Sequence, residues 1–278
     1  MGRVEIINLV DNTATKHGLL AEHGLSFLIR VNGEVILFDT GAGNTVVHNA
    51  REMGIDLSQI KKVVLSHGHY DHAGGLKKVC EVVNKSLPIY CHPETFSLKY
   101  RVDKNKKPIY IGTPWTKEEI EKIGGIFNLN CGPVELTDGV KLTGQIPRDC
   151  DFEDLNEVLC VKSGSGYVVD RLLDDQSLII DTPKGPIVVL GCSHSGLINT
   201  LQYVLSLGKY NHIYAVIGGT HLKDASLSRL EKTMTLLPKF GIEHIIACHC
   251  TGFLASAKLY QTLGDKFCFN YVGRSFCI

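Results

Sequence analysis

Residues 66–75 read Ser-His-Gly-His-Tyr-Asp-His-Ala-Gly-Gly, and this stretch carries the strongest signal of fold and function in the chain. It places four side chains that can bind a metal within six residues: His67, His69, Asp71 and His72. Neutral imidazole suits zinc, iron or manganese, and a carboxylate adds negative charge and affinity for harder ions. The glycines at 74 and 75 let the loop turn back at no steric cost. The stretch therefore predicts a metal centre rather than a solvent-exposed, histidine-rich turn.

The sequence before and after this stretch alternates between short strands and helices. A buried strand is predicted over Lys62–Leu65, directly before the histidines, and a helix over Leu76–Asn84 after them. Further upstream we predict three strands and then a helix, over Val4–Val10, Leu25–Val31, Val35–Phe38 and residues 46–53. This alternation is typical of α/β proteins, in which functional residues lie at the ends of strands.

The second half of the chain repeats the strand-and-helix pattern. Strands are predicted over Val140–Leu142, Val158–Val161, Leu178–Ile180, Ile187–Leu190, Ile213–Ile217 and His244–Ala247, and helices over Leu197–Leu207 and Leu227–Leu237. Tyr90–Ile126, with several prolines and a lysine-rich run, predicts loops or a flap instead of core. No composition change marks a linker. We therefore predict one domain over residues 1–278, a four-layer αββα sandwich of the α/β class.

Three further histidines follow strand-like runs in this half: His194, His221 and His249. We expect His194 and His249 to bind metal, and His221 to be either a ligand or a contact to the substrate. Cys248 and Cys250 flank His249 and could add thiolates, but free cysteines are mostly small buried hydrophobes, so we do not count them as ligands.

The stretch His67–His72 resembles the His-x-His-x-Asp-His signature of the metallo-β-lactamase superfamily. Within it, nearly the whole chain is similar to the 7,8-dihydropterin-6-methyl-4-(β-D-ribofuranosyl)aminobenzene-5'-phosphate synthase group, also called dihydropteroate-synthase-like. The similarity rests on further motifs at Glu22-His23-Gly24-Leu25-Ser26, Phe38-Asp39-Thr40-Gly41, Cys91-His92-Pro93, Gly191-Cys192-Ser193-His194, Gly218-Gly219-Thr220-His221-Leu222 and His249-Cys250-Thr251-Gly252.

The resemblance implies one or two divalent metal ions, with zinc as the first expectation and iron, manganese or magnesium as alternatives. The implied ligands are His67, His69, Asp71, His72, His194 and His249. Asp39 is expected to orient a ligand histidine through its second nitrogen. The chain departs from the family pattern because no Gly-Asp follows the Leu178–Leu190 hairpin, and Cys192 and His194 occupy that place. The family histidine ahead of the hairpin is also missing, where residues 174–177 read Asp-Asp-Gln-Ser. The number of metals therefore stays open.

The implied activity is the transfer of a pterin methyl group with loss of diphosphate. Asp71 and His221 are the expected catalytic residues, with Asp71 first a ligand and alternatively a general base. His221 or Lys99 could bind phosphate. Two alternatives stay open: a metal-dependent hydrolase of a phosphodiester, lactone or thioester, and a non-catalytic, metal-dependent ligand sensor.

Composition limits the partners. Lys plus Arg and Asp plus Glu each number 29 in 278 residues, so no basic excess favours nucleic acid or anionic membrane. A small-molecule substrate is the expected partner, and the resemblance implies that it is phosphorylated. Met1-Gly2-Arg3 leads directly into a strand pattern without a signal-peptide core, and no apolar run approaches the ~20 residues of a membrane span. We therefore expect a cytoplasmic protein whose ten cysteines are reduced thiols.

Overall fold

A computed structural model of the chain describes residues 3–208 and 210–278. Met1 and Gly2, from which we expected a direct entry into the first strand, lie outside the described residues. Contacts between Cα atoms divide the chain into two compact units. Unit 1 includes Cys131–Asp154 and Asp175–Asn270, and unit 2 comprises Gly2–Asn130, Leu155–Asp174 and Tyr271–Ile278. Each unit joins segments that are distant in sequence, and the single domain over residues 1–278 stays a prediction.

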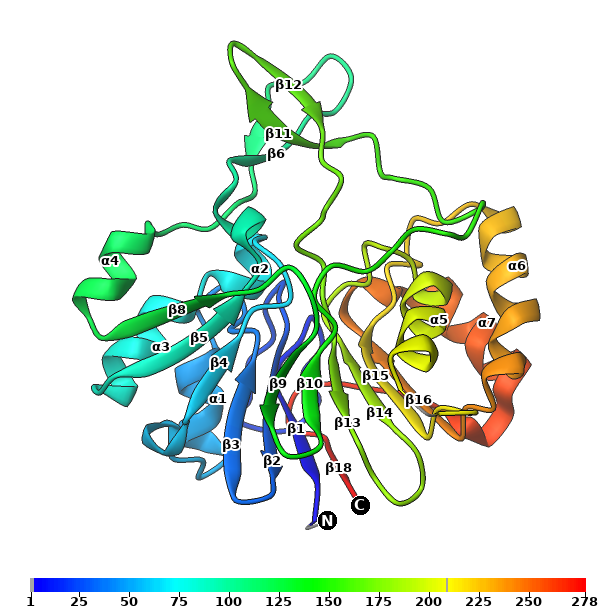
Figure 1. Cartoon of the computed structure of the whole chain (residues 1–278), viewed down its shortest axis with the longest axis horizontal. Helices are drawn as coiled ribbons and strands as arrows, with labels where there is room; N and C mark the ends of the chain where they lie inside the picture. Colours follow the sequence, from blue (N-terminus) through cyan, green and yellow to red (C-terminus); the bar gives the residue numbers. More distant parts are fainter. Residues whose placement is uncertain (1–2, 209) are drawn as a thin grey trace. The chain divides into compact units, whose positions relative to one another are not determined.

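Unit 2 contains a seven-stranded sheet in the order β18-β1-β2-β3-β4-β5-β8. Its strands are β1 (Glu5–Val10), β2 (Ser26–Val31), β3 (Glu34–Phe38), β4 (Lys62–Val64), β5 (Leu87–Cys91), β8 (Gly125–Leu129) and β18 (Ser275–Cys277). The neighbours β3, β4, β5 and β8 run parallel, and β1, β2 and β3 pair antiparallel. The helices α1 (Val46–Glu52), α3 (Leu76–Val83) and α4 (Lys117–Lys122) contribute apolar side chains to the core of this sheet. Figure 1 shows these helices next to its strands.

A small four-stranded sheet also belongs to unit 2, in the order β12-β11-β6-β7. It is formed by β6 (Lys99–Arg101), β7 (Ile109–Tyr110), β11 (Leu159–Ser163) and β12 (Gly166–Val169). The prediction of loops or a flap over 90–126 was therefore wrong in part, since α4, β8 and the end of β5 also lie there. Pro88 masked β5, because a proline normally argues against a central strand.

Unit 1 contains a second seven-stranded sheet, in the order β17-β16-β15-β14-β13-β10-β9. Its strands are β9 (Val134–Thr137), β10 (Val140–Leu142), β13 (Leu178–Ile180), β14 (Ile187–Leu190), β15 (Ala215–Gly219), β16 (His244–Cys248) and β17 (Phe267–Phe269). The helices α5 (Leu197–Leu207), α6 (Leu227–Leu236) and α7 (Phe253–Leu263) bury apolar side chains in one core with β13 to β16. The predicted bounds of β13, β14 and α5 are confirmed, whereas α7 was not predicted.

Parallel strands determine where the functional loops emerge. In unit 1, β14, β15 and β16 are parallel neighbours, so their carboxyl ends meet at one edge of the sheet. In unit 2, β3 and β4 are parallel neighbours, and β4 leads into the histidine loop and the short helix α2 (Tyr70–Ala73). The remaining helical turns are 3-10 segments: Leu57–Gln59, Pro93–Phe96, Leu237–Phe240, His249–Thr251 and Gly264–Lys266. In the part of the chain that the structure describes, no helix has the length and apolar character needed to cross a membrane.

Candidate metal centre

Unit 2 gathers the four predicted ligands of the first histidine cluster. His67 and His69 lie on the loop after β4, Asp71 and His72 lie in α2, and all four are buried. The Nε2 atom of His67 is 3.0 Å from the Nδ1 atom of His69. Two nitrogens bound to one tetrahedral zinc, at about 2.1 Å each, lie about 3.4 Å apart. The donor atoms of this pair therefore have a spacing close to that of two ligands on one ion.

Asp39, at the end of β3, holds Ser66 and the ring of His72 in position. Its Oδ2 accepts hydrogen bonds from the Ser66 hydroxyl and from Nδ1 of His72, both at 2.7 Å, and its Oδ1 accepts from the Ser66 backbone N–H. Bonding at Nδ1 directs the other ring nitrogen, Nε2, away from the carboxylate. The predicted contact between Asp39 and a candidate ligand histidine is confirmed, and this partner arrangement is typical of metal-binding histidines.

A second buried carboxylate, Asp174, holds the loop between His67 and His69. Its Oδ2 accepts the backbone N–H of Gly68 at 2.7 Å, and its Oδ1 accepts from the Lys99 ammonium at 3.0 Å. A side chain at Gly68 would meet the backbone oxygen of Thr95 at 2.3 Å, so only glycine fits there. The loop is thus fixed by a charge-assisted hydrogen bond and by close packing.

Lys99 does not serve as a free phosphate contact, in contrast to our expectation. Its side chain is 1 % exposed, and its ammonium also donates to Asp170 at 2.8 Å. Burial lowers the pKa of Lys99, but the charges of Asp174 and Asp170 outweigh it and raise the pKa above its usual value. Lys99 is a structural cation between two carboxylates, a role that a lysine on a short strand in sequence does not reveal.

Charge and burial favour the neutral form of the imidazole at His69. Burial lowers the pKa of His69 to about 3, and the positive charge of Lys99 adds to this effect. A neutral ring keeps a lone pair for a metal, so the protonation state of His69 suits a ligand near neutral pH.

The exposed edge of the cluster pairs Asp71 with a histidine that sequence reasoning did not single out. Nδ1 of His23 lies 3.5 Å from Oδ2 of Asp71 and 3.1 Å from the Tyr70 hydroxyl, and the His23 side chain is 60 % exposed. Nε2 of His72 lies 3.7 Å from the same Asp71 oxygen. His23 stood in a motif that supported the resemblance, but its distance in sequence from residues 67–72 concealed the contact.

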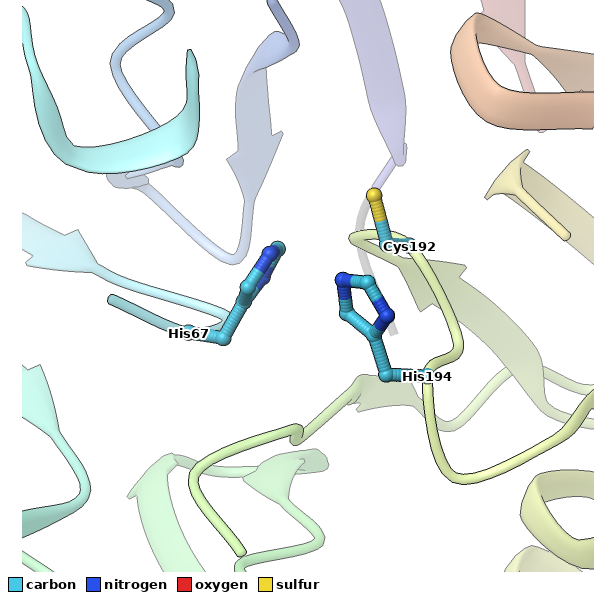
Figure 2. Close-up of side chains that lie close together, drawn as sticks. All are labelled: His67, Cys192 and His194. Atoms are coloured by element: carbon cyan, nitrogen blue, oxygen red, sulfur yellow. The ribbon is translucent and has the colours of Figure 1, made fainter. Parts of the chain in front are cut away.

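Unit 1 gathers the later histidines on the loops that follow β14, β15 and β16. His194 and His249 are buried and His221 is half-buried. Figure 2 shows Cys192 and His194 projecting from the loop after β14, and His67 on its own loop after β4. The Sγ atom of Cys192 lies within 4.8 Å of a ligand atom of each of His194, His221, His249 and Cys250. The structure therefore brings the predicted histidines of this half together around a cysteine that was not predicted as a ligand.

The loop of His194 is held in the same way as the loop of His67. Asp175 is buried, and its Oδ2 accepts the backbone N–H of Ser195 at 2.7 Å, while Arg148 donates to the His194 carbonyl at 2.8 Å. Asp174 belongs to unit 2 and Asp175 to unit 1, so the chain passes between the units at this bond. Two adjacent carboxylates therefore support one histidine loop each. In sequence they appeared only as a departure from the family pattern.

Strained backbone marks the same loops. Ser193, His221 and His249 have left-handed φ values of 58°, 48° and 53°. Such conformations cost about 1–3 kcal/mol for a non-glycine residue and persist where the surroundings enforce them. Strain concentrated beside the candidate ligands is consistent with a functional site.

The two cysteines that flank His249 have different surroundings. The Cys248 sulfur faces the amide of Asn270 at 3.9 Å, whereas the Cys250 sulfur accepts the backbone N–H of His221 at 3.2 Å. Burial would raise the pKa of the Cys250 thiol, but hydrogen bonds from Cys192 and His221 and the charge of His249 bring it well below its usual value. The donors of unit 1 are thus imidazoles and thiols, which fit a divalent ion of the zinc type.

Known proteins are similar to this chain in sequence and in fold. The sequence profile of the Metallo-beta-lactamase superfamily matches residues 20–147. The 7,8-dihydropterin-6-methyl-4-(beta-D-ribofuranosyl)-aminobenzene-5'-phosphate synthase of Methanocaldococcus jannaschii is 36% identical over 255 residues, covering 89% of this chain and 87% of that protein. An uncharacterised protein of the same organism is 34% identical over 266 residues, covering 96% and 97%. The crystal structure of Tm1679, a metal-dependent hydrolase of the beta-lactamase superfamily, matches 98% of both chains with a TM-score of 0.83 and 29% identity.

Proposed function

Because the chain belongs to the metallo-β-lactamase superfamily, we propose that it is a metal-dependent enzyme that acts on a phosphorylated small molecule. We further propose that it is a synthase of the dihydropterin type, transferring a pterin methyl group with loss of diphosphate. The observation that carries this proposal is the 36% identity over 89% of the chain to the synthase of Methanocaldococcus jannaschii. The predicted α/β fold of this superfamily is confirmed by the same comparisons.

In this proposal, six residues hold one or two divalent ions: His67, His69, Asp71, His72, His194 and His249. The buried imidazoles, their supporting carboxylates and the 3.0 Å spacing of the His67 and His69 nitrogens support the assignment. The bound ion would supply positive charge against the negative charge that develops on the departing diphosphate.

The chain's own residues position these groups and meet the substrate. Asp39, Asp174 and Asp175 keep the ligand loops and rings in place before substrate arrives, which avoids the cost of ordering them during the reaction. His221 is the proposed contact or ligand at the edge of the thiol cluster, and Asp71 is first a ligand. The His23 side chain beside Asp71 is 60 % exposed, so its ring is accessible to a substrate.

A hydrolase is the second candidate, and the likeness to Tm1679 favours it. That protein is described as a metal-dependent hydrolase, and it matches 98% of this chain at 29% identity. The same metal chemistry can direct water to a phosphodiester, lactone or thioester. The synthase and the hydrolase differ in the nucleophile, which is the amino nitrogen of the aminobenzene in the first and water in the second. Both need the same ligand loops.

The experiment incubates purified protein, loaded in turn with Zn²⁺, Fe²⁺, Mn²⁺ or Mg²⁺, with a dihydropterin methyl diphosphate. The ribofuranosylaminobenzene phosphate is present in one arm and absent in the other. The synthase proposal expects a condensed product by mass spectrometry only when both compounds are present, with one diphosphate released per product. Diphosphate release without condensation would instead support the hydrolase. Metal and ligand binding with no turnover of any substrate would contradict both and leave a sensor.

A further inference from the structure

Three adjacent parallel strands of unit 1 bring two cysteines and a histidine to one point. Cys192 follows β14, His221 follows β15 and Cys250 follows β16. Two sulfurs and one ring nitrogen from these residues all lie within 4.8 Å of one another. Because the strands are neighbours in the sheet, the approach follows from the fold and not from a flexible loop.

Close packing between the loops fixes the positions of these three residues. A Cβ atom at Gly219 would lie 2.6 Å from the Cys250 sulfur and 2.5 Å from the Gly191 carbonyl, so only glycine permits the approach. The Thr220 hydroxyl donates to the Thr251 hydroxyl at 3.0 Å, which joins the loops after β15 and β16. The backbone N–H of Lys223 donates to the Cys250 carbonyl at 3.1 Å.

One of the atoms in this group that could bind a metal is a ring nitrogen of His221. Nδ1 of His221 is buried and has no hydrogen-bond partner among residues 3–208 and 210–278. A buried nitrogen without a partner destabilises the folded protein unless a ligand satisfies it. The Cys250 sulfur accepts the backbone N–H of His221 at 3.2 Å and donates to the Cys192 carbonyl at 3.5 Å, so these contacts hold it beside the other two residues of the site. The backbone of His221 is left-handed, a strained conformation that persists only where the surrounding structure enforces it.

We propose that Cys192, His221 and Cys250 form a thiolate-containing metal site that binds an ion of the zinc type. Each thiol gives its proton to solvent as the metal–sulfur bond forms, so binding releases protons. Two thiolates and one imidazole favour Zn²⁺ over Mn²⁺ or Mg²⁺, which prefer oxygen ligands. This gives His221 a ligand role. The inference deepens the proposed function and rests on it for the premise that the chain binds a divalent metal.

The position of Cys192 links this site to the proposed histidine ligands of the same unit. Its Sγ lies within 4.8 Å of ligand atoms of His194 and His249 as well as of the other two residues of the site. The rings of His194 and His221 are in contact, with centroids 4.3 Å apart. Cys192 is therefore the sulfur that selects the metal for this half of the proposed centre.

X-ray absorption at the zinc edge of the full-length, zinc-loaded protein tests the proposal without any substitution. A Zn–S distance of about 2.3 Å beside Zn–N distances of about 2.0–2.1 Å is expected. Bound zinc with nitrogen and oxygen neighbours alone would overturn this inference and leave the proposed function standing. Failure to bind any divalent metal would overturn both, so the two failures are distinguishable.

Substitutions then assign the sulfur. The Zn–S component should weaken in Cys192→Ser and in Cys250→Ser and vanish in the double variant, with zinc affinity reduced by at least the ~10- to 100-fold that loss of a supporting partner causes. The preference for Zn²⁺ over Mn²⁺ should fall with it. Cys248→Ser is the matched control, because that buried sulfur faces Asn270, and its Zn–S component should be unchanged. A Zn–S component that persisted in the double variant would overturn the assignment, and circular dichroism of each variant verifies the fold.

Discussion

Replacing Asp174 with Asn tests whether one buried carboxylate sets the position of the loop that carries His67 and His69. Its two oxygens accept from the Gly68 N–H at 2.7 Å and from the Lys99 ammonium at 3.0 Å. Asparagine keeps the shape but replaces one oxygen with an NH₂ group, so one of these two donors then faces another donor. Lys99 keeps its ion pair with Asp170 in this variant, so the loss is that of one buried hydrogen-bond acceptor, about 1–3 kcal/mol, and not that of a buried charge left without any partner. We expect the free energy of unfolding to fall by about that amount.

The same substitution should weaken metal binding in protein that is still folded. A partner that orients a ligand is worth about 10- to 100-fold in metal affinity, and Asp174 acts through the backbone between two candidate ligands. Urea denaturation measures the stability, and competition with a chromophoric chelator measures the zinc affinity. Lys99→Met should destabilise the protein more than Asp174→Asn, because it leaves both Asp170 and Asp174 without their cation. Asp103→Asn, at an exposed ion pair with Arg101, is the control and should change neither quantity.

Two results would refute this reasoning. Unchanged stability in Asp174→Asn would mean that the buried pair contributes nothing, and the contact to Lys99 would lose its structural role. Reduced stability with zinc affinity unchanged would show that Asp174 supports the fold without positioning the ligand loop. Only a loss of both, measured at a urea concentration where each variant is folded, agrees with the proposed positioning role.

Other substitutions test the remaining assignments. His69→Ala should lower both bound metal and turnover while exposed His48→Ala lowers neither, and retained metal in the first would contradict the ligand assignment. Asp71→Asn should lose part of its metal, and excess metal should restore part of the rate; a low rate at full occupancy would indicate a general base instead. His23→Gln should reduce kcat and leave metal content unchanged, so a loss of metal would make His23 a ligand. If residues 1–278 form one domain, urea unfolding should give a single transition by fluorescence and by circular dichroism, and two separated transitions would oppose that prediction.

Patterns local in sequence predicted the parts of the fold that local forces decide. β13 and β14 are continuous apolar runs, mostly of isoleucine and valine, around a Pro-Lys-Gly turn, and α5 has helical apolar spacing. Their bounds were therefore predicted to the residue. β5 was not predicted, because Pro88 breaks the pattern while the neighbours β4 and β8 provide its pairing. α7 was missed because its first residues, including Phe253, are exposed and its buried face has a single large apolar side chain, Leu259, beside Ala255 and Ser256.

The candidate metal centre likewise has a part that the sequence predicted and a part that it did not. The cluster from His67 to His72 was predictable because its donors are adjacent in sequence. Contacts between distant segments were not predictable: Asp174 with Gly68, His23 with Asp71, and Cys192 with Cys250 all depend on which loops the sheets bring together. Asp39 is the exception, since a strand-end aspartate before a histidine loop has a known use as an orienting partner.

Cys192 stands where the family pattern has the aspartate of a Gly-Asp motif, which bears on the choice of metal. In the family pattern a carboxylate after the hairpin bridges the metals, and a carboxylate accepts hard ions such as manganese or magnesium as well as zinc. This chain has Cys192 at that place, with the Cys250 sulfur nearby. If the proposed thiolate site is correct, sulfur in place of an oxygen donor narrows the choice of metal toward zinc. A search for activity with magnesium or manganese alone would then examine an incompletely loaded protein. Absence of turnover counts against the proposed function only when it is measured on zinc-loaded enzyme of verified metal content.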